Sequence, residues 1–111
     1  MKFTSSQRHI ASALSLAERF AGKNITLPIL GNVLLEVEAN VLRVTATNLE
    51  YAIQLEVTGS GASPGRATVP AKILSALMQS VKEDKVELQE KQKNLWVKTE
   101  TRETRINGMD P

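Results

Sequence analysis

The sequence predicts an α+β domain in which one order of elements, a strand, a helix and three strands, occurs twice. Three observations predict it: two segments carry apolar residues at helical spacing, six segments alternate apolar with polar residues, and a Gly-rich stretch separates the halves. The 111 residues suit one domain with a single core. We expect two helices packed on two antiparallel four-stranded sheets, because this arrangement buries both apolar helix faces.

The first half begins with a short strand over residues 1–5 and continues with a helix over roughly 7–21. Ser5 or Ser6 can cap the start of this helix, and Gly22 can end it. An apolar stripe recurs at helical spacing through Ile10, Ala13, Leu14, Ala17, Phe20 and Ala21.

Three strands follow the first helix. Residues 27–32 contain Pro and Gly, so we expect an extended connector there. Alternating apolar residues then mark the strands, at Val33, Leu35 and Val37, at Leu42, Val44 and Ala46, and at Tyr51, Ile53, Leu55 and Val57. The stretch 59–65 (GSGASPG) is expected to be a flexible surface loop.

The second half repeats the order. A short strand over 66–69 leads to Pro70, which suits the first position of a helix over 71–81. The apolar stripe of this helix is Ile73, Leu74, Leu77, Met78 and Val81, and the residues expected away from it are Lys72, Ser75 and Gln79. The last three strands are marked by Val86 and Leu88, by Leu95 and Val97, and by Thr104 and Ile106.

The composition argues against catalysis and metal binding. There is no cysteine, and His9 is the only histidine, so no second residue of either type exists to share a metal ion with it. The carboxylates of the strands suit a solvated sheet face better than a catalytic pair. We therefore expect no catalytic residue, no metal and no cofactor. The sequence lacks a signal peptide and a membrane span, which predicts a cytoplasmic protein without membrane contact.

Five segments stand out, in this order along the chain: 1–4 (MKFT), 26–35 (TLPILGNVLL), 45–50 (TATNLE), 68–71 (TVPA) and 105–109 (RINGM). Together they resemble the bacterial sliding clamp family, the DNA polymerase III beta subunit, at that family's spacing. The resemblance spans essentially the whole chain and covers the first, N-terminal, of three domains. It implies that residues 1–111 are a single domain with the DNA clamp fold, cut from a three-domain protomer.

The resemblance also implies a function without catalysis. In the family, two protomers close into a ring whose helices line a hole around duplex DNA, and the ring confers processivity on the replicative polymerase. The implied partners are duplex DNA of any sequence, a second protomer, and, through the full-length protein, DNA polymerase III and the clamp loader. The pocket for polymerase and loader peptides is expected outside this chain.

The resemblance places one DNA contact in the loop before TLPIL, usually at an arginine. Here that position is Asn24, preceded by Lys23. A second family contact matches Lys72. A protein that slides should touch phosphates and read no bases, so Arg8 and Arg19 on the first helix are further candidates by residue type. Arg19 could equally pair with a neighbouring acid, and 23–24 could be an ordinary polar loop.

The last strand offers a candidate protomer interface at Thr104 and Ile106. In the family, this edge pairs with the third domain of the other protomer, and Thr104 stands where an aromatic is common. The strand could also be an ordinary edge blunted by charged residues. The formal net charge of +2 is too small to indicate DNA binding by itself, so a free-standing protein-interaction domain with no DNA role stays open as the alternative function.

Overall fold

The computed structural model describes residues 1–21, 31–47 and 51–108. The helices are α1 (Gln7–Phe20) and α2 (Ala71–Ser80). The strands of the first half are β1 (Lys2–Ser6), β2 (Asn32–Glu38), β3 (Val41–Thr47) and β4 (Ala52–Thr58). The remaining strands are β5 (Ser60–Ser63), β6 (Gly65–Pro70), β7 (Lys85–Lys91), β8 (Asn94–Lys98) and β9 (Glu103–Ile106). The predicted strand–helix–three-strand repeat is confirmed, with β5 as an additional strand between the halves.

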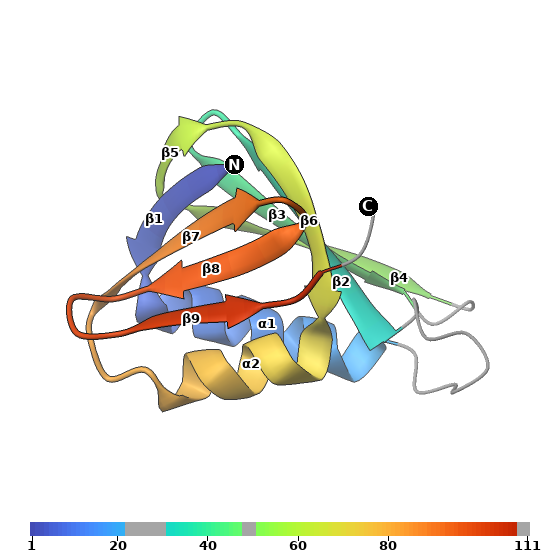
Figure 1. Cartoon of the computed structure of the whole chain (residues 1–111). Helices are drawn as coiled ribbons and strands as arrows, with labels where there is room; N and C mark the ends of the chain where they lie inside the picture. The colour runs from blue at the N-terminus through green and yellow to red at the C-terminus, as the bar shows by residue number, and fades with distance from the viewer. Residues whose placement is uncertain (22–30, 48–50, 109–111) are drawn as a thin grey trace.

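The strands form two antiparallel sheets, one with the order β5-β1-β7-β8-β9 and one with the order β4-β3-β2-β6. The expectation of two four-stranded sheets is therefore wrong for the first sheet, which has five strands. Figure 1 shows this sheet in front of the other, with both helices along one side of the molecule. In the described residues, neither helix is long and apolar enough to cross a membrane.

The fifth strand comes from the stretch that was expected to be a flexible loop. β5 pairs with β1, and the backbone N–H of Gly61 in β5 donates a hydrogen bond of 3.1 Å to Asn40 Oδ1. A Cβ atom at Gly61 would overlap the carbonyl oxygen of Ala39. The glycine therefore lets the chain run close to the turn between β2 and β3, and this close approach orders the stretch.

The first helix follows the expected pattern. Ser6 is its N-cap, and the Ser6 hydroxyl oxygen accepts a hydrogen bond of 3.2 Å from the backbone N–H of His9. At its end, the N–H of Ala21 donates to the carbonyl oxygens of Ala17 and Glu18. Its fully buried face comprises Ile10, Ala11, Leu14 and Ala17. Gly22, the expected stop, lies outside the described residues.

The second helix buries most of the expected face, with Leu74, Met78 and Val81 buried and Leu77 partly buried, but Ile73 and Ser75 are placed differently from the prediction. Its buried residues are Ala71, Leu74, Ser75 and Met78, at spacings of three and four. Ser75 is only 2% exposed, whereas Ile73, assigned to the apolar stripe, is 56% exposed. Ile73 was assigned to the stripe because it is hydrophobic. The residues of α2 that pack against the core are instead those at 71, 74, 75 and 78, and Ile73 lies beside this row.

The helices lie side by side and antiparallel (Figure 1). The side-chain amide of Gln7, at the start of α1, donates to the carbonyl oxygen of Met78, near the end of α2, over 2.9 Å. The core beneath them joins both halves of the chain. Its largest fully buried side chains are Phe3, Ile10, Leu14, Leu35, Leu42, Leu74, Met78, Leu88 and Leu95.

Candidate nucleic-acid interface

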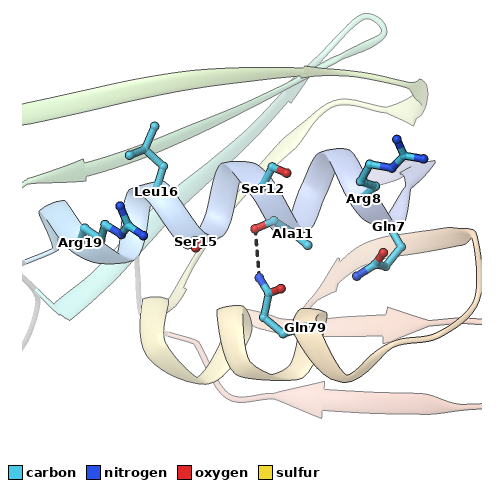
Figure 2. A pocket seen from close by; sticks show the side chains of 8 residues that line it. All are labelled: Gln7, Arg8, Ala11, Ser12, Ser15, Leu16, Arg19 and Gln79. Carbon is cyan, nitrogen blue, oxygen red and sulfur yellow. Dashed lines mark hydrogen bonds between the residues drawn. The ribbon is translucent and has the colours of Figure 1, made fainter.

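An open groove runs along the outer side of the helix pair. Its lining residues are Gln7, Arg8, Ala11, Ser12, Ser15, Leu16 and Arg19 from α1, and Gln79 from α2. Figure 2 shows these side chains, with Arg8 and Arg19 toward opposite ends of α1. The groove therefore combines two long cations with small polar groups between them.

Both arginines are available to an anion. Arg8 and Arg19 are exposed, and the ion pairs found among the described residues join Lys2 to Glu87 and Arg43 to Glu56 instead. Within residues 1–21, 31–47 and 51–108, the alternative in which Arg19 pairs with a neighbouring acid is therefore not observed. At a rise of 1.5 Å per residue, the two arginines stand roughly 16 Å apart along the helix. Flexible guanidinium groups at this separation suit contacts with backbone phosphates.

The polar side chains of the groove also hold the helices together. Gln79 Nε2 donates a hydrogen bond of 3.1 Å to the carbonyl oxygen of Ala11, and Gln7 makes the matching bond in the other direction. The sequence predicted neither glutamine as a link between the helices, and Gln79 was expected only to lie away from the apolar stripe. Their roles depend on which helix faces meet, and helical spacing alone does not reveal that.

The other predicted DNA contacts are placed differently. Lys72 is exposed on the first turn of α2 and does not line the groove. Because the helices are antiparallel, it lies toward the end of the pair where α1 finishes. Lys23 and Asn24 lie outside the described residues. The structure thus brings Arg8 and Arg19 together in one groove.

A second, more apolar hollow lies beside β9. It is lined by Pro70, Ile73, Leu77, Thr104, Arg105, Ile106 and Asn107. Thr104 and Ile106, the predicted interface residues, therefore line the same hollow as the exposed Ile73, although Ile106 is only 5% exposed and belongs to the core. Among the strands of the described residues, β9 pairs only with β8, which leaves its other edge unpaired there. An exposed isoleucine beside an open strand edge is typical of a surface that meets another protein surface.

The four-stranded sheet has a comparable open edge at β4. The hollow beside it is lined by His9, Ser12, Ala13, Leu16, Leu55, Glu56, Val57 and Thr58. The large hydrophobic residues that are exposed in the described part of the chain are Leu16, Tyr51 and Ile73. Leu16 lines the β4 hollow, Tyr51 directly precedes β4, and Ile73 lines the β9 hollow.

One carboxyl group has a clearly shifted pKa. Hydrogen bonds from the side chains of Thr101 and Thr99 lower the pKa of Glu83 to about 2. The Thr101 hydroxyl donates to Glu83 Oε2 over 2.6 Å, which ties the loop after α2 to the loop before β9. Glu83 therefore remains ionised at neutral pH and is unsuited to proton transfer. Within the described residues, no cluster of three or more histidine, cysteine or acidic residues could hold a metal ion.

The comparison with known families decides the classification. The family model described as "DNA polymerase III beta subunit, N-terminal domain" matches residues 1–111. The chain belongs to this family. The beta sliding clamp is a non-catalytic processivity factor of DNA replication, in agreement with the prediction from the sequence.

Curated relatives agree with this classification. The chain is 39% identical to the beta sliding clamp of Synechocystis sp. over 90 residues, which cover 79% of this chain and 23% of that protein. It is 39% identical to the beta sliding clamp of Vibrio harveyi over 87 residues, 78% of this chain and 60% of that sequence. The chain thus spans only part of the length of the relatives it matches.

Solved structures confirm the fold. The DNA polymerase III subunit beta of Pseudomonas aeruginosa matches with a TM-score of 0.92 and 30% identity, over 99% of this chain and 30% of that one. A Helicobacter pylori beta clamp bound to a DNA ligase peptide matches with a TM-score of 0.94 and 21% identity, over 99% of this chain and 31% of that one. The α+β architecture with two helices and two antiparallel sheets is therefore that of a beta clamp domain.

Proposed function

We propose that this chain is one segment of a ring-shaped sliding clamp that encircles duplex DNA and tethers the replicative polymerase to it. The segment is the N-terminal domain, residues 1–111, of a longer protomer with three domains. The observation that carries the proposal is the helix groove, in which Arg8 and Arg19 flank small polar side chains, in a chain of the sliding clamp family.

The groove chemistry supports contact without sequence reading. Arginine side chains on a convex helix surface can reach phosphates, whereas base recognition needs an element that enters a groove of the duplex. Ser12 and Ser15 add hydrogen-bonding capacity without bulk. Lys72, and Lys23 with Asn24 in the part of the chain not described, would extend the same phosphate-contacting surface.

The two open strand edges support assembly into a ring. β9 and β4 belong to different sheets, and each is flanked by an exposed hydrophobic side chain, Ile73 at one and Leu16 at the other. Two unlike edges favour a head-to-tail contact, and head-to-tail contacts close into rings when the rotation allows. We propose that the surface with Thr104 and Ile106 meets another protomer and that the β4 edge meets a neighbouring domain.

A paired-variant experiment tests the groove. The isolated chain should bind a labelled duplex weakly, with a Kd near 10⁻⁴ M or weaker at physiological salt, since about two to four phosphates are contacted. Fluorescence anisotropy at several low salt concentrations should give a slope of log affinity against log salt of roughly −2 to −4. Arg8→Gln with Arg19→Gln should make that slope shallower by about 2. Arg43→Gln with Arg66→Gln, on the outer face of the four-stranded sheet, is the matched control and should change it little.

The outcomes of this experiment distinguish a sliding contact from a dedicated DNA-recognition domain. Micromolar or tighter binding, or a preference between duplex sequences, would indicate a dedicated DNA-recognition domain. Equal effects of the two variant pairs would exclude the groove as the interface. The ring itself is tested with the full-length protein loaded onto nicked circular DNA by its clamp loader. The protein should remain on the circular DNA at high salt and dissociate once the circle is cut, because a closed ring can leave DNA only by sliding off a free DNA end.

A further inference from the structure

The outward face of the five-stranded sheet concentrates positive charge. Phe3, Leu88 and Val97 are buried in this sheet, so the residues that alternate with them point away from the core. Among the described residues, the cations on that face are Lys2, Lys85, Lys91, Lys98 and Arg105, and the carboxylates are Glu87 and Glu103. The outward face of the other sheet, in the same part of the chain, has the cations Arg43 and Arg66 and the carboxylates Glu36, Glu38 and Glu56. The two faces therefore carry opposite charge.

One row of side chains crosses the positive face from strand to strand. Lys2 lies opposite Gln89, Gln89 opposite Trp96, and Trp96 opposite Arg105. Adjacent strands are about 4.8 Å apart, so the row extends over roughly 14 Å. It contains no carboxylate, and it contains the only tryptophan of the chain. A cation stands at each end, with an amide and an indole between them.

The contacts within this face leave its polar groups able to bind a ligand. Arg105 is exposed, and its Cζ atom lies 6.0 Å from the centroid of the Trp96 ring. Lys98 Nζ donates 3.1 Å to Gln89 Oε1, which leaves the amide nitrogen of Gln89 as a donor. Lys2 is 3.7 Å from Glu87, and the side chain of Lys2 remains 44% exposed.

We propose that this face binds single-stranded nucleic acid. Lys2, Lys98 and Arg105 contact phosphates, Trp96 packs against a base, and Gln89 donates to a base edge. Basic residues combined with an aromatic side chain form the usual platform for unpaired strands, since every base offers a flat face for stacking. A sheet face presents such side chains upright and side by side, as in the sheets that bind single-stranded RNA.

Two other ligands fit the row less well. A duplex keeps its base faces stacked inside, so no base face would reach Trp96. An acidic peptide would be attracted by the cations but would make no use of the indole between them. The structural alternative is that Trp96 and Arg105 form a cross-strand pair that stabilises the sheet and binds no ligand. In that case, substitution of Trp96 would lower the stability of the domain but would not change the binding of a ligand.

Trp96 reports directly on the proposed site. The chain is titrated with an oligothymidylate of about 12 nucleotides at low salt, within the site sizes of single-strand platforms, and the fluorescence of Trp96 is followed. We expect quenching, with a slope of log affinity against log salt of about −2 for three phosphates of a single strand. Lys98→Gln should make that slope shallower. Trp96→Leu, measured by anisotropy of a labelled oligonucleotide, should weaken binding about fivefold or more, since stacking on one base is lost.

The controls make every outcome decisive. Arg43→Gln with Arg66→Gln, on the outer face of the other sheet, should leave the quenching of Trp96 by oligothymidylate unchanged. Trp96→Leu should leave duplex binding unchanged, so the two proposals are tested separately. The thermal midpoint of each variant is measured without ligand, which detects a purely structural loss. Absence of quenching, loss of quenching in the Arg43 and Arg66 variant, or unchanged oligothymidylate binding in Trp96→Leu would overturn the proposal. Equal quenching by poly-L-glutamate would assign the face to acidic polymers in general and would overturn it too.

Discussion

The side-chain amide of Gln79 on α2 donates a 3.1 Å hydrogen bond to the carbonyl oxygen of Ala11 on α1. With the bond from Gln7 to Met78, it links the antiparallel helices at two points, one in each direction. The helices that carry the proposed DNA contacts are thus held together by side chains that themselves belong to the groove. Stability of the helix pair and geometry of the groove should therefore respond to the same substitutions.

Replacing Gln79 with methionine should test this link. The variant keeps the length of the side chain and loses the donor, so the free energy of unfolding should fall by about 0.5–1.5 kcal/mol. Urea melts would measure the change. Gln54→Met, on the exposed face of β4, is the control. It loses only a longer, exposed bond of 3.3 Å to Thr45 Oγ1 and should stay within about 0.5 kcal/mol of the wild type. A loss no larger at Gln79 than at Gln54 would mean that water replaces the bond without cost.

Gly61→Ala should be strongly destabilising. The added methyl group would overlap the carbonyl oxygen of Ala39, and backbone cannot give way as a flexible side chain can. We expect a loss of about 1–3 kcal/mol or more, the range for forced overpacking. Ser60→Ala, at the exposed neighbouring position, should cost little. Thermal melts that left Gly61→Ala unchanged would show that β5 can move away from the β2–β3 turn.

The order of elements was predictable because the local spacing of apolar residues marks each of these strands and helices. β5 was not, since Gly, Ala, Ser and Pro favour loops locally and its pairing with β1 depends on contacts distant in sequence. The groove arginines followed from residue type on the polar face of a helix. The hydrogen bonds of Gln7 and Gln79 and the exposure of Ile73 could not be predicted from residue type, because both depend on which face of α2 meets its neighbours.

Leu74 and Leu77 form a matched pair for the burial of α2. Leu74 is fully buried, whereas Leu77 is partly buried and lines the hollow beside β9. Leu74→Ala, like Leu14→Ala on α1, should lower the unfolding free energy by about 2–5 kcal/mol. Leu77→Ala should cost clearly less in urea melts of this chain. Equal losses at both positions would mean that the β9 hollow is closed in solution.

Lys93→Gly should stabilise the domain. Gln92 and Lys93 connect β7 and β8 with positive φ angles of 52° and 71°, a conformation that favours glycine at the second turn position. The left-handed conformation costs a residue with a side chain about 1–2 kcal/mol, and the extra freedom of glycine in the unfolded chain returns part of that. We expect a net gain of about 0.5–1 kcal/mol, measured by urea melts. Lys91→Gly, within the strand, should instead lower stability.

Thr101→Val should raise the pKa of Glu83 from about 2 toward its ordinary value of 4.5. The hydroxyl of Thr101 donates to the ionised carboxylate, so its removal takes away the main stabilisation of the charged form. Because the folded pKa of Glu83 is depressed, its contribution to stability is present above pH 4.5 and is lost as the pH falls through about 2. NMR titration of the carboxyl carbon of Glu83 would measure its pKa in the wild type and in the variant directly.

Thermal melts between pH 4.5 and about pH 2 should show a shallower loss of stability with acid in Thr101→Val. Thr45→Val, on the outer face of β3, is the control and should keep the wild-type profile. An unchanged pKa of Glu83 in Thr101→Val would mean that Thr99 and the backbone alone hold the carboxylate.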